Sequence, residues 1–96
     1  MVFEVVISPR AQKEIENAID YYALNSTDAP ANFIAALKEV YELLAMNPFY
    51  RIRYKNVRAI VLKRFPHYLY YVIKEDKQIV RVLSCFHGRR NPTTRP

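Results

Sequence analysis

The chain has 96 residues, of which 51% are apolar and 25% are charged, and its formal net charge is +6. This length suits one domain, residues 1–96, and the composition argues against a disordered chain. No apolar run reaches the roughly 20 residues that span a bilayer, and the first residues do not resemble a signal peptide, so we expect a cytoplasmic protein with no membrane partner.

The first half of the chain carries strand and then helix signals. The β-branched run Val2–Ile7 predicts a strand. Ser8–Pro9 suits the start of a helix, because serine caps free amides and proline fits the first turn. Apolar side chains spaced by three and four residues predict an amphipathic helix to about Leu24, and a second such pattern predicts a helix from about Pro30 to Asn47–Pro48. A short polar loop would join the two helices into a hairpin.

The second half of the chain is extended in pattern. Three runs rich in β-branched and aromatic residues predict consecutive strands at Val57–Phe65, Tyr68–Lys74 and Ile79–Phe86, and Tyr50–Tyr54 could add a short strand before them. Short links between these runs predict an antiparallel meander. The fold class is therefore predicted as α+β, in the order β-α-α-β-β-β, with the helical hairpin packed on one face of a mainly antiparallel sheet.

Strict alternation assigns the side chains of the last predicted strand to two faces. One face would carry Val80, Val82, Ser84 and Phe86, and the other Ile79, Arg81, Leu83, Cys85 and His87. Arg81 and His87 would then share a face, about 20 Å apart. Cys85 is expected to be a buried apolar side chain without reactivity. Gly88, the only glycine, would allow a turn with positive φ.

The charge of the chain divides unevenly at Pro48. Residues 1–48 have three basic and seven acidic side chains, a net of −4, whereas residues 49–96 have twelve basic and two acidic ones, a net of +10. Such an asymmetry within one domain predicts that the basic half is a binding surface. One cysteine and two histidines match no metal-binding spacing, so we expect no metal and no other cofactor.

The candidate binding residues are basic or aromatic side chains of this second half. They are Arg58, Lys63, Arg64, Tyr68, Arg81, His87, Arg89 and Arg90. Each also has a structural interpretation, because charges often mark the end of a buried strand and tyrosines often pack across strands. An imidazole at a strand end can transfer protons, and adjacent guanidiniums can pair with phosphates. By itself, the sequence His87–Arg90 favours binding over catalysis.

Several segments of the chain, taken in order, resemble toxins of the RelE/ParE superfamily of bacterial toxin–antitoxin systems. They are Val5–Ala11 with the two helices after it, Asn47–Pro48, the strand with Arg58, Phe65–Val72 and Val80–Pro92. The resemblance implies a growth-inhibiting toxin of a type II, plasmid-stabilising module. It also implies a small cognate antitoxin that folds onto the toxin as a helix, sometimes with an added strand, in a hetero-oligomer.

RelE-like members of the superfamily cut messenger RNA in the ribosome. This chemistry needs activation of a 2′-hydroxyl, stabilisation of the phosphorane and protonation of the leaving oxygen. The resemblance would assign these roles to His87, Arg90 and either Lys63 or Arg64. The set departs from the RelE pattern, because Tyr68 stands where RelE has an arginine and no tyrosine follows Arg90.

ParE-like members bind DNA gyrase and block it. Their last strand commonly ends in His, a small residue and Arg, followed by Asp or Asn, and His87–Pro92 is similar. We therefore expect a ParE-like gyrase inhibitor that acts by binding and is neutralised by its antitoxin. The alternatives are a ribosome-dependent endoribonuclease that acts on the ribosome and messenger RNA, and a non-toxic basic module that binds nucleic acid.

Overall fold

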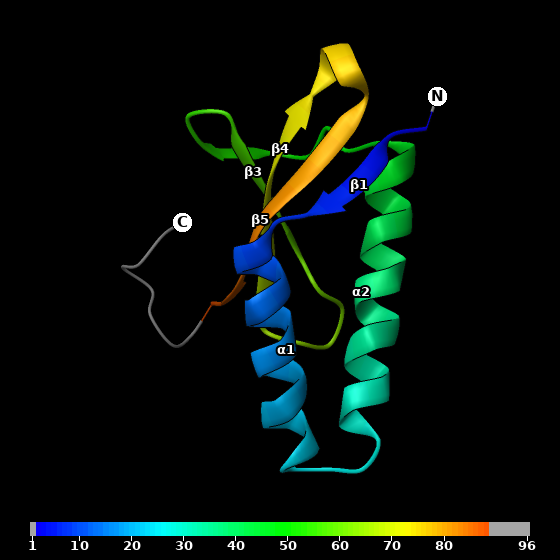
Figure 1. Ribbon diagram of the computed structural model, residues 1–96, viewed down its shortest axis with the longest axis vertical. Coiled ribbons are helices and arrows are strands. Elements are labelled where there is room, and N and C mark those ends of the chain that lie inside the picture. The colour runs from blue at the N-terminus through cyan, green and yellow to red at the C-terminus, as the bar shows by residue number, and fades with distance from the viewer. Residues whose placement is uncertain (1, 89–96) are drawn as a thin grey trace.

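The computed structural model describes residues 2–88, which form two helices and a five-stranded sheet (Figure 1). The elements in chain order are β1 (Glu4–Ile7), α1 (Pro9–Ala23), α2 (Ala29–Met46), β2 (Ile52–Tyr54), β3 (Val57–Val61), β4 (His67–Lys74), a 3₁₀ turn (Glu75–Lys77) and β5 (Ile79–His87). The predicted α+β fold is confirmed, and the short strand expected before β3 is present. Neither helix in residues 2–88 has the length and apolarity of a bilayer span.

The strands lie in the order β1-β5-β4-β3-β2. β1 runs parallel to β5, with Val5 opposite Val80, and the other neighbouring strands are antiparallel. A parallel pair needs a long crossover connection, and the helical hairpin is part of that connection. Both helices contribute side chains to one buried cluster with β1, β4 and β5, so they cover the same face of the sheet. We call this face the helix side.

Local sequence signals explain where the helices begin and end. Ser8 caps α1, because its Oγ accepts a hydrogen bond from Ala11 N at 3.2 Å, and Pro9 occupies the first turn. α2 ends where Asn47 becomes extended, as expected for the residue before a proline, Pro48. The predicted hairpin is confirmed, with α1 and α2 side by side in Figure 1.

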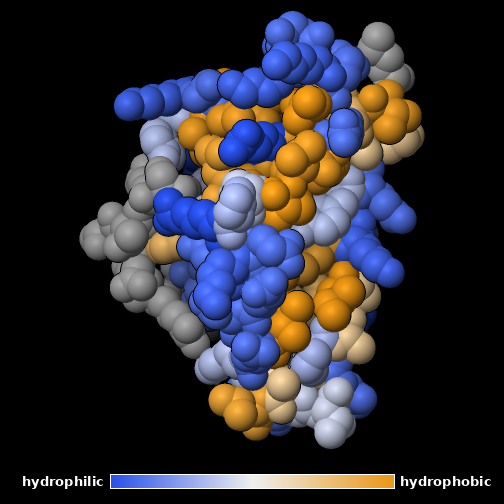
Figure 2. Space-filling view, viewed as in Figure 1, coloured by the Kyte–Doolittle hydropathy of each residue, from blue (hydrophilic) through white to orange (hydrophobic). Residues whose placement is uncertain are grey.

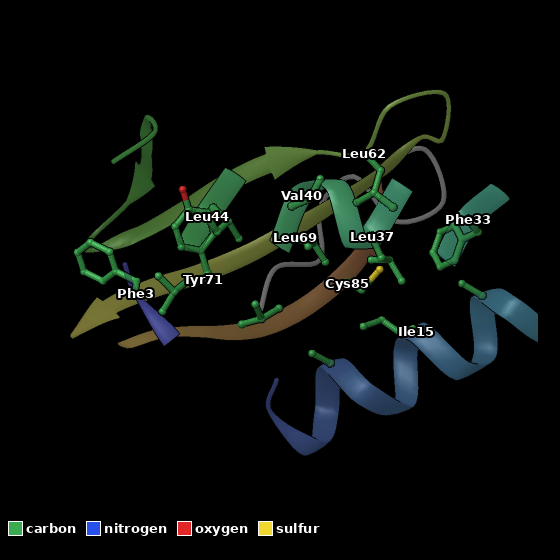
Figure 3. Close-up of a cluster of buried hydrophobic side chains, with 14 residues drawn as sticks. Phe3, Ile15, Phe33, Leu37, Val40, Leu44, Leu62, Leu69, Tyr71 and Cys85 are labelled. Atoms are coloured by element: carbon green, nitrogen blue, oxygen red, sulfur yellow. The ribbon is translucent and has the colours of Figure 1, made fainter. Parts of the chain in front are cut away.

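The core fills the space between the helices and the sheet. Figure 3 shows core side chains from the helices and the strands pointing toward one another. The fully buried members include Phe33, Leu44, Leu69, Tyr71, Val80 and Val82. Tyr71 is the largest of them, and its hydroxyl donates to Pro48 O at 2.7 Å. This hydrogen bond ties the end of α2 to the middle of the sheet.

Tyr71 gives the stability of the fold a dependence on alkaline pH. Burial raises the pKa of Tyr71 from 10.0 to about 12. The unfolded chain releases this proton near pH 10, whereas the folded protein holds it to about pH 12. The contribution of Tyr71 to stability is therefore complete below pH 10 and is lost as the pH rises through 12, a loss on the order of 2 kcal/mol in the free energy of unfolding.

Tyr71→Phe should reduce the loss of stability between pH 10 and pH 12. It also removes the hydrogen bond to Pro48, which should lower the free energy of unfolding by about 1 kcal/mol at neutral pH. Urea unfolding followed by circular dichroism, from neutral pH to pH 12, measures both effects. Tyr41→Phe is a useful comparison, because burial raises the pKa of Tyr41 to about 12 as well. A Tyr71→Phe profile as steep as that of the unmodified protein would contradict the prediction.

The strand predicted to run to Phe65 ends earlier. β3 stops at Val61, because the chain turns back through Arg64, whose φ is 72°. Leu62 N then donates to His67 O at 2.9 Å and closes the turn. Arginine rarely adopts a positive φ, so the sequence carries no clear signal of this turn.

A β-bulge in β5 breaks the alternation of its side chains. Tyr71 pairs with Val82, but Tyr70 pairs with Ser84, so Leu83 is left without a partner in β4. An extra residue of this kind changes the face to which the following side chains point.

The bulge overturns the predicted assignment of faces at the end of β5. Cys85 joins the core on the helix side, whereas Phe86 packs on the opposite face. Arg81 pairs with Val72 and lies on that opposite face, and His87 lies on the helix side against His67. The predictions that Arg81 and His87 share a face, and that Phe86 lies with the core side chains of the strand, are therefore wrong.

Candidate functional site

The face of the sheet opposite the helices is largely apolar and aromatic. Its buried members are Val57, Tyr70 and Val72, and its partly exposed members are Tyr54, Ala59, Tyr68, Leu83 and Phe86. We call this surface the open face, because the described residues place no helix over it. Its partly exposed apolar side chains are the part that a partner could contact, and apolar side chains gathered at the surface commonly mark an interaction site.

Basic side chains lie on and around the open face. Arg81 is exposed and lies between Val6 of β1 and Val72 of β4 in the strand register. The Arg53 guanidinium lies 5.6 Å from the centre of the Tyr68 ring, a cation–π contact. Figure 2 shows one side of the molecule, on which apolar surface in the strand-bearing half is bordered by hydrophilic side chains.

A shallow cavity adjoins the open face at the β4–β5 turn. Its volume is about 380 Å³, and it is lined by Val6, Lys74, Asp76, Lys77, Ile79 and Arg81. Three of these side chains are cations and one is an anion, so the cavity suits an acidic group of a partner.

The structure places Arg58 on the helix side of the sheet, where it has partners within the chain. Arg58 pairs with the core residue Tyr71 across β3 and β4. Its guanidinium donates to Tyr50 O and lies 5.4 Å from the centre of the Phe49 ring. Arg58 therefore braces the segment that joins α2 to β2, which is the structural interpretation of this side chain.

Lys63 and Arg64 lie together in the turn between β3 and β4, beside α2. They line a cavity of about 370 Å³ with Asn32, Glu39 and Phe65. Lys63 Nζ is 3.9 Å from Glu39 Oε1, and both side chains are largely exposed, so this ion pair contributes little to stability. Lys63 and Arg64 lie on the helix side of the sheet, away from Arg81.

His87 lies in a different cavity, between α1 and the end of β5. This cavity has a volume of about 140 Å³, and His87 lines it with Glu14, Tyr21, His67 and Cys85. The described ribonuclease candidates, Lys63, Arg64 and His87, thus line two separate cavities. Arg90, the remaining ribonuclease candidate, and Arg89, a candidate binding residue, lie outside the described residues.

His67, which lies between two of the strands predicted from the sequence, is a core residue at the start of β4. It is 5% exposed, and its Nε2 lies 3.1 Å from the Tyr22 hydroxyl. Its ring centre is 4.9 Å from that of His87, and its Nδ1 is 3.9 Å from Cys85 Sγ. Burial raises the pKa of the Cys85 thiol to about 12, and the Glu14 carboxylate adds to this effect. The expectation of a buried and unreactive Cys85 agrees with this setting.

Gly88 is explained by close packing and not by its backbone conformation. Its φ is not positive, so the predicted positive-φ turn is wrong. Gly88 N donates to Pro66 O at 2.8 Å, which holds the chain against Tyr68. A Cβ at this position would lie 2.7 Å from Tyr68 Cε1, closer than side chains can approach.

Gly88→Ala should therefore displace the Tyr68 ring and lower the free energy of unfolding by about 1–3 kcal/mol. A double-mutant cycle with Tyr68→Ala tests the cause, because alanine at position 68 removes the atoms that clash. Urea unfolding of the four proteins gives the coupling free energy. If Gly88→Ala were equally costly in the presence and absence of the tyrosine ring, the close approach to Tyr68 would not explain the glycine.

Comparison with known proteins identifies the family. The family described as the ParE toxin of the type II toxin–antitoxin system parDE matches residues 5–92. The chain belongs to this family. The resemblance to the RelE/ParE superfamily seen in the sequence is thereby confirmed. No curated protein matches the sequence.

Two solved structures share the fold of this ParE-family chain. A chain of the chromosomal ParDE toxin–antitoxin system from P. aeruginosa has 15% sequence identity and a TM-score of 0.64, and the alignment covers 90% of this chain and 96% of that one. A chain of the RelBE2 toxin–antitoxin complex from Mycobacterium tuberculosis has 15% identity and a TM-score of 0.63, with coverages of 91% and 99%. This chain thus shares its fold with a chain of a ParDE system and with a chain of a RelBE2 complex.

Of the predicted site residues in this ParE-family chain, the structure brings Tyr68 and Arg81 to the open face. It adds Arg53, which lies in β2 between Ile52 and Tyr54 and contacts the Tyr68 ring. It also adds Phe86, which only the bulge places there. An apolar, aromatic surface with cations on and around it suits the binding of an amphipathic, acidic segment of another protein.

Proposed function

We propose that this ParE-family protein is a toxin that inhibits DNA gyrase by binding it, and that a cognate antitoxin neutralises the toxin. The open face is the observation that carries the proposal, because its apolar centre and the cations around it fit a protein partner. The membership of the family over residues 5–92 supports the toxin class. Such a toxin would act in the cytoplasm, inhibit growth and stabilise the plasmid or locus that encodes it.

The antitoxin would cover the open face with an amphipathic segment. The apolar side of that segment would pack on Tyr68, Leu83 and Phe86, and its acidic side chains would meet Arg81 and Arg53. Aromatic and arginine side chains commonly dominate such interfaces. Because strand β1 lies at an edge of the sheet, the antitoxin could also add a strand there. The toxin and antitoxin would form a hetero-oligomer.

Purified toxin tests the gyrase proposal directly. Negative supercoiling of relaxed plasmid by gyrase should fall as toxin is added, and the activity should return when an equimolar amount of the antitoxin follows. Relaxation of the same plasmid by a type I topoisomerase is the control for unspecific binding to DNA. Unchanged supercoiling and unchanged gyrase-dependent cleavage of DNA at saturating toxin would refute the proposal.

The same protein can be tested for the two alternatives. The first alternative is the ribosome-dependent endoribonuclease, and the likeness in fold to a chain of the RelBE2 complex is a reason to test it. Its catalytic residues would be His87, Arg90 and either Lys63 or Arg64. Codon-phased cuts in translated messages after induction would support that mechanism in place of gyrase inhibition. A basic module that only binds nucleic acid would bind RNA and DNA with an affinity that falls steeply with salt, and it would not inhibit growth.

A further inference from the structure

Glu14 on α1 contacts the bulge of β5, although the two are 70 residues apart in the chain. Its Oε1 accepts hydrogen bonds from Ser84 Oγ at 2.8 Å and from Cys85 N at 3.0 Å. Ser84 is fully buried, so its hydroxyl cannot turn to water instead. Hydrogen bonds to a carboxylate are stronger than those between neutral groups, and a buried donor that loses its acceptor is costly.

The topology of the sheet explains why α1 is needed at this point. β1 pairs with β5 only as far as Val82, and within residues 2–88 no strand borders that edge of β5 beyond Val82. Ser8 and Glu14 replace that strand. Ser8 N donates to Val82 O at 2.9 Å, Ser8 Oγ donates to Leu83 O at 3.1 Å, and Glu14 accepts from Cys85 N. The backbone groups around the bulge are thus satisfied by the beginning of α1.

The bulge determines which side chains reach each face of the sheet. In the observed register the Phe86 ring lies 6.2 Å from the Tyr70 ring on the open face, and the His87 ring lies 4.9 Å from the His67 ring on the helix side. Without the extra residue, the end of β5 would pair one position out of register, and each side chain would change face. Phe86 would leave the open face and His87 would enter it.

We propose that Glu14 is a positioning residue that holds the β5 bulge and thereby determines which side chains form the open face. The effect of Glu14 on partner binding rests on the proposed function, whereas its effect on the register of β5 does not. Glu14 is itself oriented by its helix, because Oε2 lies 3.5 Å from Arg10 Nε one turn earlier. One carboxylate on the helix side would therefore control the shape of a surface on the other side of the sheet.

Glu14→Ala should release the end of β5 while the protein remains folded. In nuclear Overhauser spectra of the free toxin, the ring contacts of Phe86 with Tyr70 and of His87 with His67 should be lost. The pairing of Val82 with Tyr71, before the bulge, should remain. The affinity for the antitoxin should fall by about tenfold or more, since an aromatic side chain would be lost from the interface.

Two matched variants separate this role from a general effect on α1. Glu14→Gln keeps an oxygen acceptor on a side chain of the same length. It should therefore retain the two ring contacts, Phe86 with Tyr70 and His87 with His67, and the affinity for the antitoxin. Glu16→Ala removes the same charge from the same helix, but Glu16 bonds only to Gln12, at 3.2 Å on the exposed surface, among the hydrogen bonds of the described residues. Unchanged ring contacts in folded Glu14→Ala, or their loss in Glu16→Ala as well, would overturn the proposal.

Ser84→Ala provides the test if Glu14→Ala does not fold. This substitution removes one of the two hydrogen-bond donors to Glu14. A second set of nuclear magnetic resonance signals, from the shifted register, should therefore appear for residues 84–88. A single set of signals from the native register would overturn the proposal. Because the register is observed in the free toxin, this result does not depend on gyrase or on the antitoxin. A shifted register with an unchanged affinity for the antitoxin would instead contradict the open face as the binding surface.

Discussion

Arg81→Glu is expected to abolish the neutralisation of the toxin by its antitoxin at concentrations that suffice for the unmodified protein. Arg81 is exposed on the open face, and its cavity already contains the carboxylate of Asp76. A glutamate here would bring a negative charge against the acidic segment that we propose as the partner. Like charges at an interface cost several kcal/mol, so the affinity should fall by roughly 30- to 1000-fold. Isothermal titration calorimetry with purified antitoxin measures the change.

Lys38→Glu is the matched control for Arg81→Glu. It changes the net charge of the protein by the same amount, but Lys38 is exposed on α2, on the helix side. The affinity of Lys38→Glu for the antitoxin should stay within about threefold of that of the unmodified toxin. Any small long-range electrostatic effect of the lost charge should disappear when salt is added. Neither substitution should change the free energy of unfolding by more than about 0.5 kcal/mol. Equal losses of affinity in the two variants would mean that the total charge, and not the open face, controls binding.

The parts of the fold that depend on local signals were predictable from the sequence. Ser8, Pro9 and Pro48 act on the residues next to them in the chain, so the ends of the helices followed from their positions. The order of the elements followed from the change of apolar spacing after Pro48. The free energy that sets these features comes from capping, from backbone restriction and from one apolar face per element.

The parts that depend on contacts between distant residues were not predictable. The bulge requires Glu14 and Ser84 to meet across the fold, and nothing in the sequence near Ser84 indicates it. The faces of Phe86 and His87 were therefore assigned wrongly, and with them part of the open face. Arg81 lies before the bulge, so alternation correctly placed it on the face opposite Val80 and Val82.

Phe33→Ala is expected to lower the free energy of unfolding by about 3–5 kcal/mol, which is a large part of the total for a domain of this size. Phe33 is fully buried, and its ring centre lies 5.2 Å from those of Phe65 and His67 and 5.4 Å from that of Tyr22. Its loss would open a cavity between α1, α2 and β4. Urea unfolding followed by far-ultraviolet circular dichroism measures the change.

Two variants show whether the volume of Phe33 is responsible. Phe33→Leu fills most of the space and should cost less than about 1.5 kcal/mol, and Ile34→Ala, at the exposed neighbouring position, should cost about 0.5 kcal/mol or less. A small effect of Phe33→Ala would mean that the aromatic cluster relaxes around the gap.

Phe33→Ala and Arg81→Glu should both reduce the amount of toxin–antitoxin complex, the first by unfolding the toxin and the second by weakening the contact, and an excess of the antitoxin distinguishes these causes. Phe33→Ala leaves the open face intact, so a partner that binds only the folded toxin should raise its unfolding midpoint, with about 2.7 kcal/mol gained at a hundredfold excess over Kd. Arg81→Glu is folded without the antitoxin and should gain almost nothing at the same concentration. If the antitoxin did not stabilise Phe33→Ala, the binding surface would include the aromatic cluster beneath the helices and would not be limited to the open face.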